Sequence, residues 1–507
     1  MIKIPKIIPT DSEGFFASPG RNEFVSYAPD TDEVAFALES DLYTVTLNGQ
    51  PCAVRDCRVS AHPFNRPWPG KQRDFSQSEA AGFISFAADE AVCLRVKAKG
   101  DFKAAIVRPL SKGVSVKRIG DELEFTLCEA GSYVLELDDS HGALHIFFNE
   151  IKEYPEAAEA TYYFGPGMHF PGNINLRDGD SVYVDADATV FGSVCSTGAK
   201  NIRVFGGGVI DGCFEERITE NCYENHTKGN LRLYNCEGVS IEDVILKNSA
   251  SWCLALFGCR NVKIDGVKIV GQWRYNTDGI DLVNTSDVTV KNCFVRSFDD
   301  TVTIKGIYDF DGAIENITVE DCVLWCGWGN TCEIGVETAA REYRNITFKN
   351  CDVIHTSGPA MSVLGGNQAY IHGIRFENVN VEFSSDQEPE IVQRSEAQTY
   401  CADDLKADNL LIYVNNKPYS IRHKNPYAVV RKNSERLGRI SDVSFENIRV
   451  LTDSDEMRPL IKVKCEGESD NISGISLKGL YLNGEAQTDL SRFEAAFKNF
   501  DEAIMKN

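Results

Sequence analysis

The chain has 507 residues, of which 43% are hydrophobic and 25% charged, values that are typical of a globular protein. Its length predicts more than one ordinary domain. The formal net charge of -23 argues against nucleic acid, polyanions and anionic membrane surfaces as partners.

The first residues, MIKIPKIIPTDSEGFF, contain no apolar run typical of a signal peptide, and no later segment is long enough to span a membrane. The 17 cysteines include no CxxC pair with metal-ligand spacing. We therefore expect buried thiols in a reducing bacterial cytoplasm, and neither a metal ion nor a cofactor. The oligomeric state stays open, a homodimer included.

Residues 1–153 alternate short apolar and polar stretches, such as EVAFALESDLYTVTLNG, with Gly, Asn and Asp turns between them. This pattern predicts an N-terminal antiparallel β-sandwich. It contains no recognisable catalytic signature, so the role of this domain stays open.

Residues 154–507 are dominated by one returning phrase of two short β-branched runs joined by a small polar pair. It begins at Val239, Val262, Val288, Ile317, Ile346, Ile374, Val443 and Ile475. The first offsets, 23 to 29 residues, predict a solenoid, and two strands joined at a bend predict a parallel β-helix. Cys293, Cys322 and Cys351 fall at equivalent places and should stack inside it.

Two segments interrupt this regularity. The 69-residue step from Ile374 to Val443 leaves room for one extra coil plus an excursion, or for one long loop near 384–440. At the end of the chain, the spacing of Phe493, Ala496, Phe497 and Phe500 is helical and predicts a capping helix.

Three acids stand out within the repeats. Asp278 precedes Asp299 by 21 residues, close to the local period, so the two should lie on neighbouring coils. Asp300 can join them only if the chain bends at residues 297–299. Three close carboxylates cannot all ionise freely, so one should keep a raised pKa and donate a proton. A role in turn formation is an adequate alternative explanation for Asp278, but it does not explain the Asp299–Asp300 pair.

The segment NTDGID at 276–281, followed by the Asp pair at 299–300, resembles glycoside hydrolase family 28, the polygalacturonases, and the related family 49 of dextranases and isopullulanases. The N-terminal sandwich is more similar to family 49. The resemblance implies a right-handed parallel β-helix and hydrolysis of O-glycosidic bonds with inversion. It also implies that Asp299 is the general acid and that Asp278 and Asp300 activate water.

The resemblance has gaps that bear on the substrate. The polygalacturonases carry Gly-His-Gly after the Asp pair, where this chain has Gly327-Trp328-Gly329, and they carry an Arg-Ile-Lys that is absent here. We therefore expect a neutral oligo- or polysaccharide. The sugar, the linkage, the anomer and exo or endo action cannot be predicted. The candidate substrate-binding residues are Asn276, Asp281, Trp273, Arg274, Tyr275, Lys305, Trp328, Glu333, Glu337 and His355.

Two other functions fit the same pattern. A polysaccharide lyase would use the acids to bind Ca²⁺ and Lys305 or an arginine as the base. A non-catalytic carbohydrate-binding solenoid would use the same face without turnover.

Overall fold

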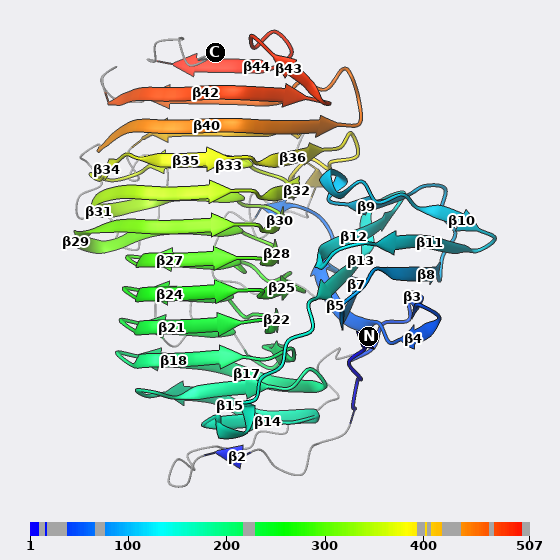
Figure 1. The fold of residues 1–507 in the computed structure, drawn as a ribbon. Helices are drawn as coiled ribbons and strands as arrows, with labels where there is room; N and C mark the ends of the chain where they lie inside the picture. Colours follow the sequence, from blue (N-terminus) through cyan, green and yellow to red (C-terminus); the bar gives the residue numbers. More distant parts are fainter. Residues whose placement is uncertain are drawn as a thin grey trace.

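The computed structural model describes residues 1–9, 16–17, 38–65, 77–215, 229–392, 401–402, 407–417, 438–465 and 471–498. Within these ranges the structure is almost entirely β, with two short 3-10 helices, η2 (Leu110–Lys112) and η3 (Ala157–Glu159). Within the same residues, no helix has the length and apolarity that a membrane span requires. Figure 1 shows a tall stack of strands with a smaller β domain against one side.

The N-terminal region folds into two sheets around a core of their own. A six-stranded sheet has the order β1-β7-β13-β12-β9, with β5 on β7, and a five-stranded sheet has the order β10-β11-β8-β3-β4. Leu94, Phe125 and Ile146 are buried in the core of this domain. The predicted β-sandwich is confirmed, but it is not wholly antiparallel, because β13 pairs with β7 in parallel.

The strands of this domain are β1 (Ile2–Lys3), β3 (Tyr43–Leu47), β4 (Gln50–Cys52), β5 (Arg55–Ser60), β7 (Ser78–Ala88), β8 (Val92–Ala98), β9 (Ala105–Arg108), β10 (Lys117–Ile119), β11 (Glu122–Leu127), β12 (Gly131–Leu137) and β13 (Asp139–Asn149).

The remainder coils into the predicted parallel β-helix, in which each strand pairs in parallel with the strand one coil later. The coils have three sheets. The first contains β20 (Leu231–Tyr234), β23 (Leu254–Phe257), β26 (Ile280–Val283), β33 (Met361–Gly365), β39 (Leu410–Asn416), β41 (Leu460–Cys465) and β44 (Glu494–Lys498).

The second sheet contains β14 (Tyr162–Phe164), β16 (Ser181–Val184), β18 (Lys200–Phe205), β21 (Glu237–Glu242), β24 (Arg260–Asp265), β27 (Ser286–Lys291), β34 (Tyr370–Ile371) and β35 (Ile374–Glu377), with β2 (Phe16–Ala17) at one end. The third contains β19 (Val209–Asp211), β22 (Ile245–Lys247), β25 (Lys268–Val270), β28 (Phe294–Ser297), β30 (Val323–Cys326), β32 (Asp352–Thr356) and β36 (Asn380–Phe383).

Six strands pass from one sheet into another: β15 (Gly167–Leu176), β17 (Ala188–Thr197), β29 (Val302–Glu320), β31 (Cys332–Lys349), β40 (Arg439–Thr452) and β42 (Ile472–Leu482). The hairpin strand β43 (Glu485–Gln487) pairs with the end of β42 that lies in the third sheet. A separate small sheet joins β6 (Phe64–Asn65), β37 (Ile391–Val392) and β38 (Cys401–Ala402).

The polar pair in each repeat forms the bend between the second and third sheets. Asn350, Asn378 and Asn447 have φ of 53°, 54° and 55°, a left-handed conformation that asparagine tolerates better than most residues. Their side chains form a ladder, in which Asn378 donates to Asn350 at 3.1 Å and Asn447 donates to Asn378 at 3.2 Å. The sequence repeat therefore encodes both the bend and the contact between coils.

The cysteine that follows the bend packs inside the coil. Cys293, Cys322 and Cys351 are buried free thiols, and the thiol of Cys322 interacts with those of the other two. The predicted internal stack is confirmed.

The predicted C-terminal capping helix is wrong for the described residues. Residues 494–498 form β44, which pairs in parallel with β41. The open edge of the first sheet offers backbone hydrogen bonds, whereas a short helix is only marginally stable by itself. Phe500 lies outside the described residues.

The long step between repeats holds an extra coil, because β39 (Leu410–Asn416) continues the first sheet between β33 and β41. Residues 393–400, 403–406 and 418–437 of the predicted 384–440 loop lie outside the described residues.

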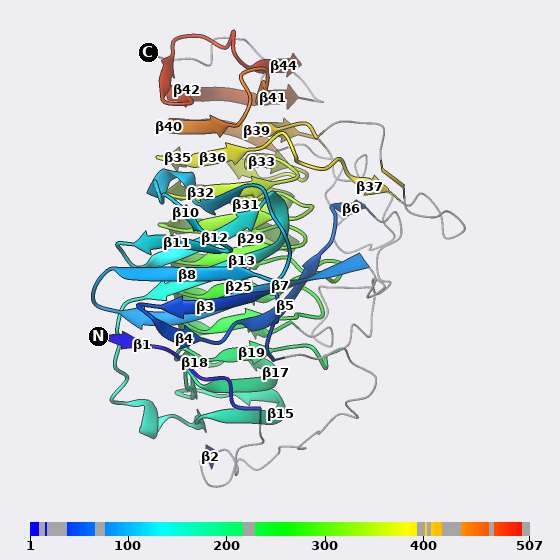
Figure 2. The same cartoon turned by 90° about the vertical axis from the view of Figure 1, so that its right-hand side faces the viewer.

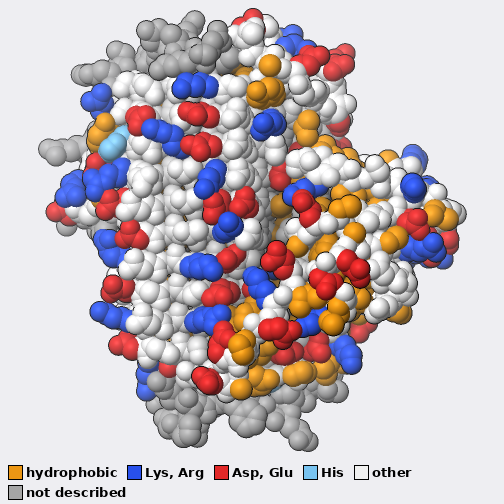
Figure 3. Space-filling view, viewed as in Figure 1, with side chains coloured by type: hydrophobic (Ala, Val, Ile, Leu, Met, Phe, Trp, Pro, Cys, Tyr) orange, Lys and Arg blue, Asp and Glu red, His pale blue; other side chains and the backbone are white. Residues whose placement is uncertain are grey.

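The outer faces of the three sheets differ. The N-terminal domain lies over the third sheet (Figure 2). Phe83 and Phe147 of this domain are buried in one cluster with Phe294 and Trp325 of the sheet. The second sheet carries alternating acidic and basic side chains (Figure 3), for example Lys349 with Glu320. Such exposed pairs are typical of a solvated face. The first sheet carries the three acids at its edge.

Candidate active site

The three acids lie where the chain passes from the third sheet to the first. Asp278 precedes β26, and the Asp pair precedes β29. β28 ends at Ser297 and β29 begins at Val302, so the bend predicted at residues 297–299 is confirmed. The amide of Gly279 donates to the carbonyl of Asp300 at 2.8 Å. Asp278 is therefore in register with Asp300. The sequence offset of 21 residues had suggested Asp299 as its neighbour instead.

The predicted clustering of the acids is also confirmed. One oxygen from each of Asp278, Asp299 and Asp300 lies within 4.8 Å of the others. Asp278 and Asp299 are buried, and the side chain of Asp300 is 16% exposed. This spacing is shorter than the roughly 6.5–9.5 Å between the two carboxyls of inverting glycosidases. Because three carboxyls share this site, the rule for a pair does not assign the stereochemistry.

One buried cation holds the cluster together. The Nζ of Lys305 lies 2.9 Å from Asp278, 2.9 Å from Asp281 and 3.3 Å from Asp300. It also lies 4.3 Å from the ring centre of Trp252, a distance at which the aromatic face attracts a cation. The interpretation of Lys305 as an ion-pair partner is thus confirmed, and three carboxyls bind one ammonium.

The surplus of carboxyls has an electrostatic consequence. Burial, reinforced by the charge of Asp300, raises the pKa of Asp299 to about 8. Burial raises the pKa of Asp278 well above its ordinary range and that of Asp281 to about 6, although Lys305 opposes both shifts. The three carboxylates in turn raise the pKa of Lys305, against the effect of its own burial. The cluster therefore retains protons near neutral pH.

Amide side chains orient the Asp pair. Asn276, at φ 54°, donates from Nδ2 to Asp299 at 3.2 Å. Asn330 donates to Asp300 from its backbone at 2.9 Å and from Nδ2 at 3.3 Å, and Nδ2 also donates to Glu333 at 2.8 Å. A Cβ at Gly329 would lie 2.5 Å from the amide nitrogen of Asp300, so the close approach of this turn requires glycine.

The floor of the site continues along the first sheet. Asp281, Thr303 and Glu333 are neighbours in the strand register and all are buried. Of the buried carboxyl oxygens that have no hydrogen-bond partner in the described residues, three lie in this site, namely Asp278 Oδ1, Asp281 Oδ2 and Glu333 Oε2. Unsatisfied buried oxygens are costly, and they are the atoms that a water or a sugar hydroxyl would satisfy.

The predicted aromatic platforms have different surroundings. Tyr275 is buried in an apolar cluster with Phe298 and Trp328, so its ring is not available for stacking on a sugar. Trp328 is half-buried and donates from Nε1 to Glu390. Trp273 is half-buried as well. Stacking of a sugar on Trp273 or Trp328 stays a prediction.

Two of the other candidates have structural partners. The guanidinium of Arg274 donates to the carbonyls of Glu215 at 2.7 Å and Cys213 at 2.9 Å. The ring of His355 contacts Glu136 of the N-terminal domain and Trp325. The prediction that His355 reaches the cleft is therefore wrong: it projects from the third sheet, which the N-terminal domain covers.

Glu337 is buried, and its charge contributes to raising the pKa of Lys305. Trp252 and Asn330 were not singled out by the sequence. Counting one coil forward and one coil back from the acids would have found both. Asn330 lies one coil after Asp300. Trp252 lies one coil before Asp278, since its neighbour Cys253 donates its amide to the carbonyl of Asp278.

Comparisons with known proteins agree with this fold and this motif. The model of glycosyl hydrolases family 28 matches residues 166–407, which confirms the resemblance drawn from NTDGID and the Asp pair. A polygalacturonase of Gossypium barbadense is 24% identical over 316 residues, 60% of this chain and 66% of that protein. The chain thus spans slightly less than two thirds of that relative.

Rhamnogalacturonase B of Aspergillus niger is 28% identical over 162 residues, 31% of this chain and 27% of that protein. Among solved structures, Dex49A from Penicillium minioluteum superposes with a TM-score of 0.61 at 13% identity, covering 92% of this chain and 94% of that one. The likeness extends over both the sandwich and the solenoid, and it supports the predicted right-handed β-helix fold.

Proposed function

We propose that this chain, whose residues 166–407 carry the sequence pattern of glycosyl hydrolases family 28, is an inverting glycoside hydrolase. The observation that carries the proposal is the buried surplus of carboxyls around Lys305, because it keeps Asp299 protonated near neutral pH. Glycoside hydrolysis needs a protonated carboxyl beside ionised ones.

Each acid has a role that follows from its surroundings. Asp299 donates its proton to the leaving oxygen, and Asn276 orients that carboxyl. Asp300, the most exposed of the three, meets the attacking water together with Asp278, while Lys305 and Asn330 fix their positions. The cluster thus supplies both the proton for the leaving oxygen and the carboxylate that takes a proton from the attacking water.

A lyase mechanism fits the contacts less well. It would need Lys305 as a neutral base, but the surrounding carboxylates raise the pKa of Lys305. The ammonium of Lys305 also lies beside two of the acids that would bind Ca²⁺. A binding solenoid without turnover has no use for a proton held on Asp299.

The substrate that we propose is a neutral glycan. Recognition of a uronic acid carboxylate favours a cation that can bind it directly. Near the cluster, Lys305 is already bound to three carboxylates, Arg274 to two carbonyls, and Arg232 to the hydroxyl of Tyr234. The acidic surplus of the site further disfavours an anionic sugar.

The test is to incubate the protein with neutral α- and β-linked oligosaccharides and with oligogalacturonides, and to measure released reducing ends. We expect turnover of a neutral substrate, with the first product in the inverted anomeric configuration by NMR. Retention would make one carboxyl a nucleophile. Efficient cleavage of oligogalacturonides would overturn the neutral-substrate proposal, and unsaturated products absorbing in the ultraviolet would identify a lyase.

We also propose a cytoplasmic location, and the many buried thiols outside disulfides support it. Cell fractionation tests it.

A further inference from the structure

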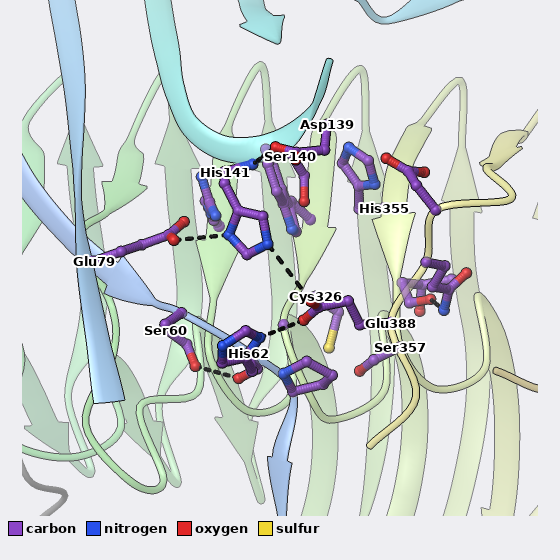
Figure 4. A pocket seen from close by; sticks show the side chains of 18 of the residues that line it. Ser60, His62, Glu79, Asp139, Ser140, His141, Cys326, His355, Ser357 and Glu388 are labelled. Atoms are coloured by element: carbon purple, nitrogen blue, oxygen red, sulfur yellow. Dashed lines mark hydrogen bonds and ion pairs between the residues drawn. The ribbon is translucent and has the colours of Figure 1, made fainter. Parts of the chain in front are cut away.

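Two histidines and a glutamate meet between the N-terminal domain and the solenoid (Figure 4). His62 follows β5, His141 lies on β13, and Glu388 lies in the segment between β36 and β37. One side-chain atom from each lies within 4.8 Å of the others. The side chains are 40%, 37% and 38% exposed, so an ion can reach them from solvent.

The two rings face the same carboxylate. His62 Nδ1 lies 2.5 Å from one oxygen of Glu388, and His141 Nε2 lies 3.7 Å from the other. Ligands at about 2.0–2.2 Å around a tetrahedral ion are roughly 3.4 Å apart. A divalent ion therefore fits between these three groups with only small movements of their side chains.

The second nitrogen of His141 is held in the manner of a metal ligand. Its Nδ1 contacts Glu79 of β7 at 2.7 Å, while Nε2 points to Glu388 (Figure 4). A carboxylate that accepts from one ring nitrogen fixes the tautomer and aims the other nitrogen at the metal. A simple ion pair between His141 and Glu388 would not need this second carboxylate.

The surroundings also suit a cation. The group opens into a pocket of about 190 Å³ that is also lined by Asp139 and Asp386. Two imidazoles and one carboxylate with an open side form a donor set that binds zinc and similar first-row ions.

We propose that His62, His141 and Glu388 form a site for a zinc-class divalent metal ion, with Glu79 as the residue that positions His141. No sequence motif marks it, since the three ligands stand 79 and 247 residues apart. The ion joins the N-terminal domain to the solenoid.

The site would fix a segment that reaches the candidate active site. Two residues beyond Glu388, Glu390 accepts from Trp328, and β37 pairs in parallel with β6. The ring of Trp328 stacks on Phe298, next to Asp299, with ring centres 5.7 Å apart. Binding of the metal therefore orders the chain that packs behind the catalytic turn.

The experiment is titration of the full chain, first stripped by a chelator, with Zn²⁺ in a calorimeter. We expect one equivalent to bind, and His62→Ala and His141→Ala each to weaken binding by about 100-fold or more. Glu79→Gln should weaken it by about 10- to 100-fold at unchanged stoichiometry. The matched control is His372→Ala, because His372 pairs with a single carboxylate, Glu342, at 2.7 Å. This substitution should leave the affinity for Zn²⁺ unchanged.

Exposed thiols are the competing ligands, since Cys128 and Cys401 are exposed. Co²⁺ distinguishes them: the proposed site gives visible bands of a nitrogen and oxygen environment without thiolate charge transfer. Zn²⁺ should also raise the melting temperature of the wild type and not that of His141→Ala. If His141→Ala fails to fold in chelator, Glu388→Gln and His62→Ala supply the comparison. Absence of stoichiometric binding, or binding unchanged in these variants, would overturn the proposal.

Discussion

Two buried clusters of charge in this molecule use similar groups in opposite ways. At the domain interface, Arg108 binds Glu136 at 2.7 Å and also binds Glu382, while His355 contacts Glu136. At the edge of the first sheet, Lys305 alone serves Asp278, Asp281 and Asp300, with Asp299 beside them.

The difference lies in the ratio of cations to carboxyls. Burial would raise the pKa of Glu136, but His355 and Arg108 outweigh burial and lower it to about 2. Burial lowers the pKa of His355, so Arg108 is the permanent cation there, and Glu382 accordingly has a pKa raised by burial to about 7. In the solenoid cluster, one ammonium cannot neutralise four carboxyls, and the pKa of Asp299 rises to about 8. The contrast is therefore between Glu136, which is ionised at neutral pH and stabilises the interface, and Asp299, which keeps a proton in the solenoid cluster.

The same carboxyl-to-amide exchange should therefore give opposite results at the two clusters. Asp299→Asn removes the proton donor, and we expect kcat to fall by about 10³-fold or more. Stability should not fall, because a carboxyl with a raised pKa loses stability as the pH rises from its ordinary 3.8 to about 8, and an amide has no such loss. Steady-state kinetics and the melting temperature at pH 7 measure both effects.

A suitable control is Asp287→Asn, on β27 of the second sheet, where the side chain is 37% exposed. It should leave kcat unchanged. Near-wild-type turnover by Asp299→Asn on substrates with poor leaving groups would show that Asp299 is not the general acid. The proposed difference between the two clusters would then be wrong.

At the interface, Glu136→Gln should destabilise the fold without affecting the chemistry. It leaves Arg108 buried with less compensation, which we expect to cost about 3–5 kcal/mol, while kcat of the folded enzyme changes by less than about threefold. Glu136 contributes stability above its ordinary pKa of 4.5, and this contribution is lost as the pH falls towards 2. Chemical denaturation at pH 7 and at pH 3 should show a smaller difference between variant and wild type in acid.

Glu315→Gln provides the exposed counterpart, because the side chains of Glu315 and Arg344 are 24% and 43% exposed. Breaking that pair should cost less than about 1 kcal/mol. An equal cost for the two variants would mean that burial does not distinguish the interface network.

The two regions also differ in how far the sequence predicted them. The period of the phrase VTVKNCFV and its relatives predicted the β-helix, since the β-branched runs are strands and the Asn, Asp or Gly between them forms the bend. Asp278, Asp299 and Asp300 were found because a short motif spans a single coil. The partners at the interface, such as Glu136 and His355, are 219 residues apart and have no local signal.

The predictions from sequence that were wrong also failed because of contacts with distant parts of the chain. The phenylalanines near the C-terminus have helical spacing, but the free edge of β41 offers hydrogen bonds to a strand, and β44 forms there. His355 follows the Asp pair by about two coils, yet its side chain is directed by Glu136, a residue of the N-terminal domain. Side-chain direction on a coil depends on what packs against it, and a single sequence does not give that.

The pH dependence of activity tests the stored proton directly. The proton on the cluster must be present for catalysis, so kcat/KM should fall about tenfold per unit as the pH rises above about 8. This value belongs to the coupled cluster, because its carboxyls titrate together. A profile that stays flat to pH 10 would mean that the cluster donates no proton.

The smallest effect that we predict is that of Asp281→Asn on the pH dependence of kcat/KM, and it tests the cause of the raised pKa of Asp299 directly. Burial raises the pKa of Asp281 to about 6, so it is ionised near pH 8, where its charge helps to raise the pKa of Asp299. Asp281→Asn removes that charge and leaves Lys305 with fewer carboxylates to serve. Both changes favour the ionised form of Asp299, so the alkaline limb of kcat/KM should move to lower pH. We expect a loss of about two- to fivefold at pH 8 and a much smaller loss at pH 6, where Asp299 still holds its proton. Profiles recorded from pH 5 to 10 for wild type and variant measure this shift. A uniform loss at every pH would give Asp281 a role in binding the sugar alone, and a shift to higher pH would contradict the ratio of cations to carboxyls as the cause of the stored proton.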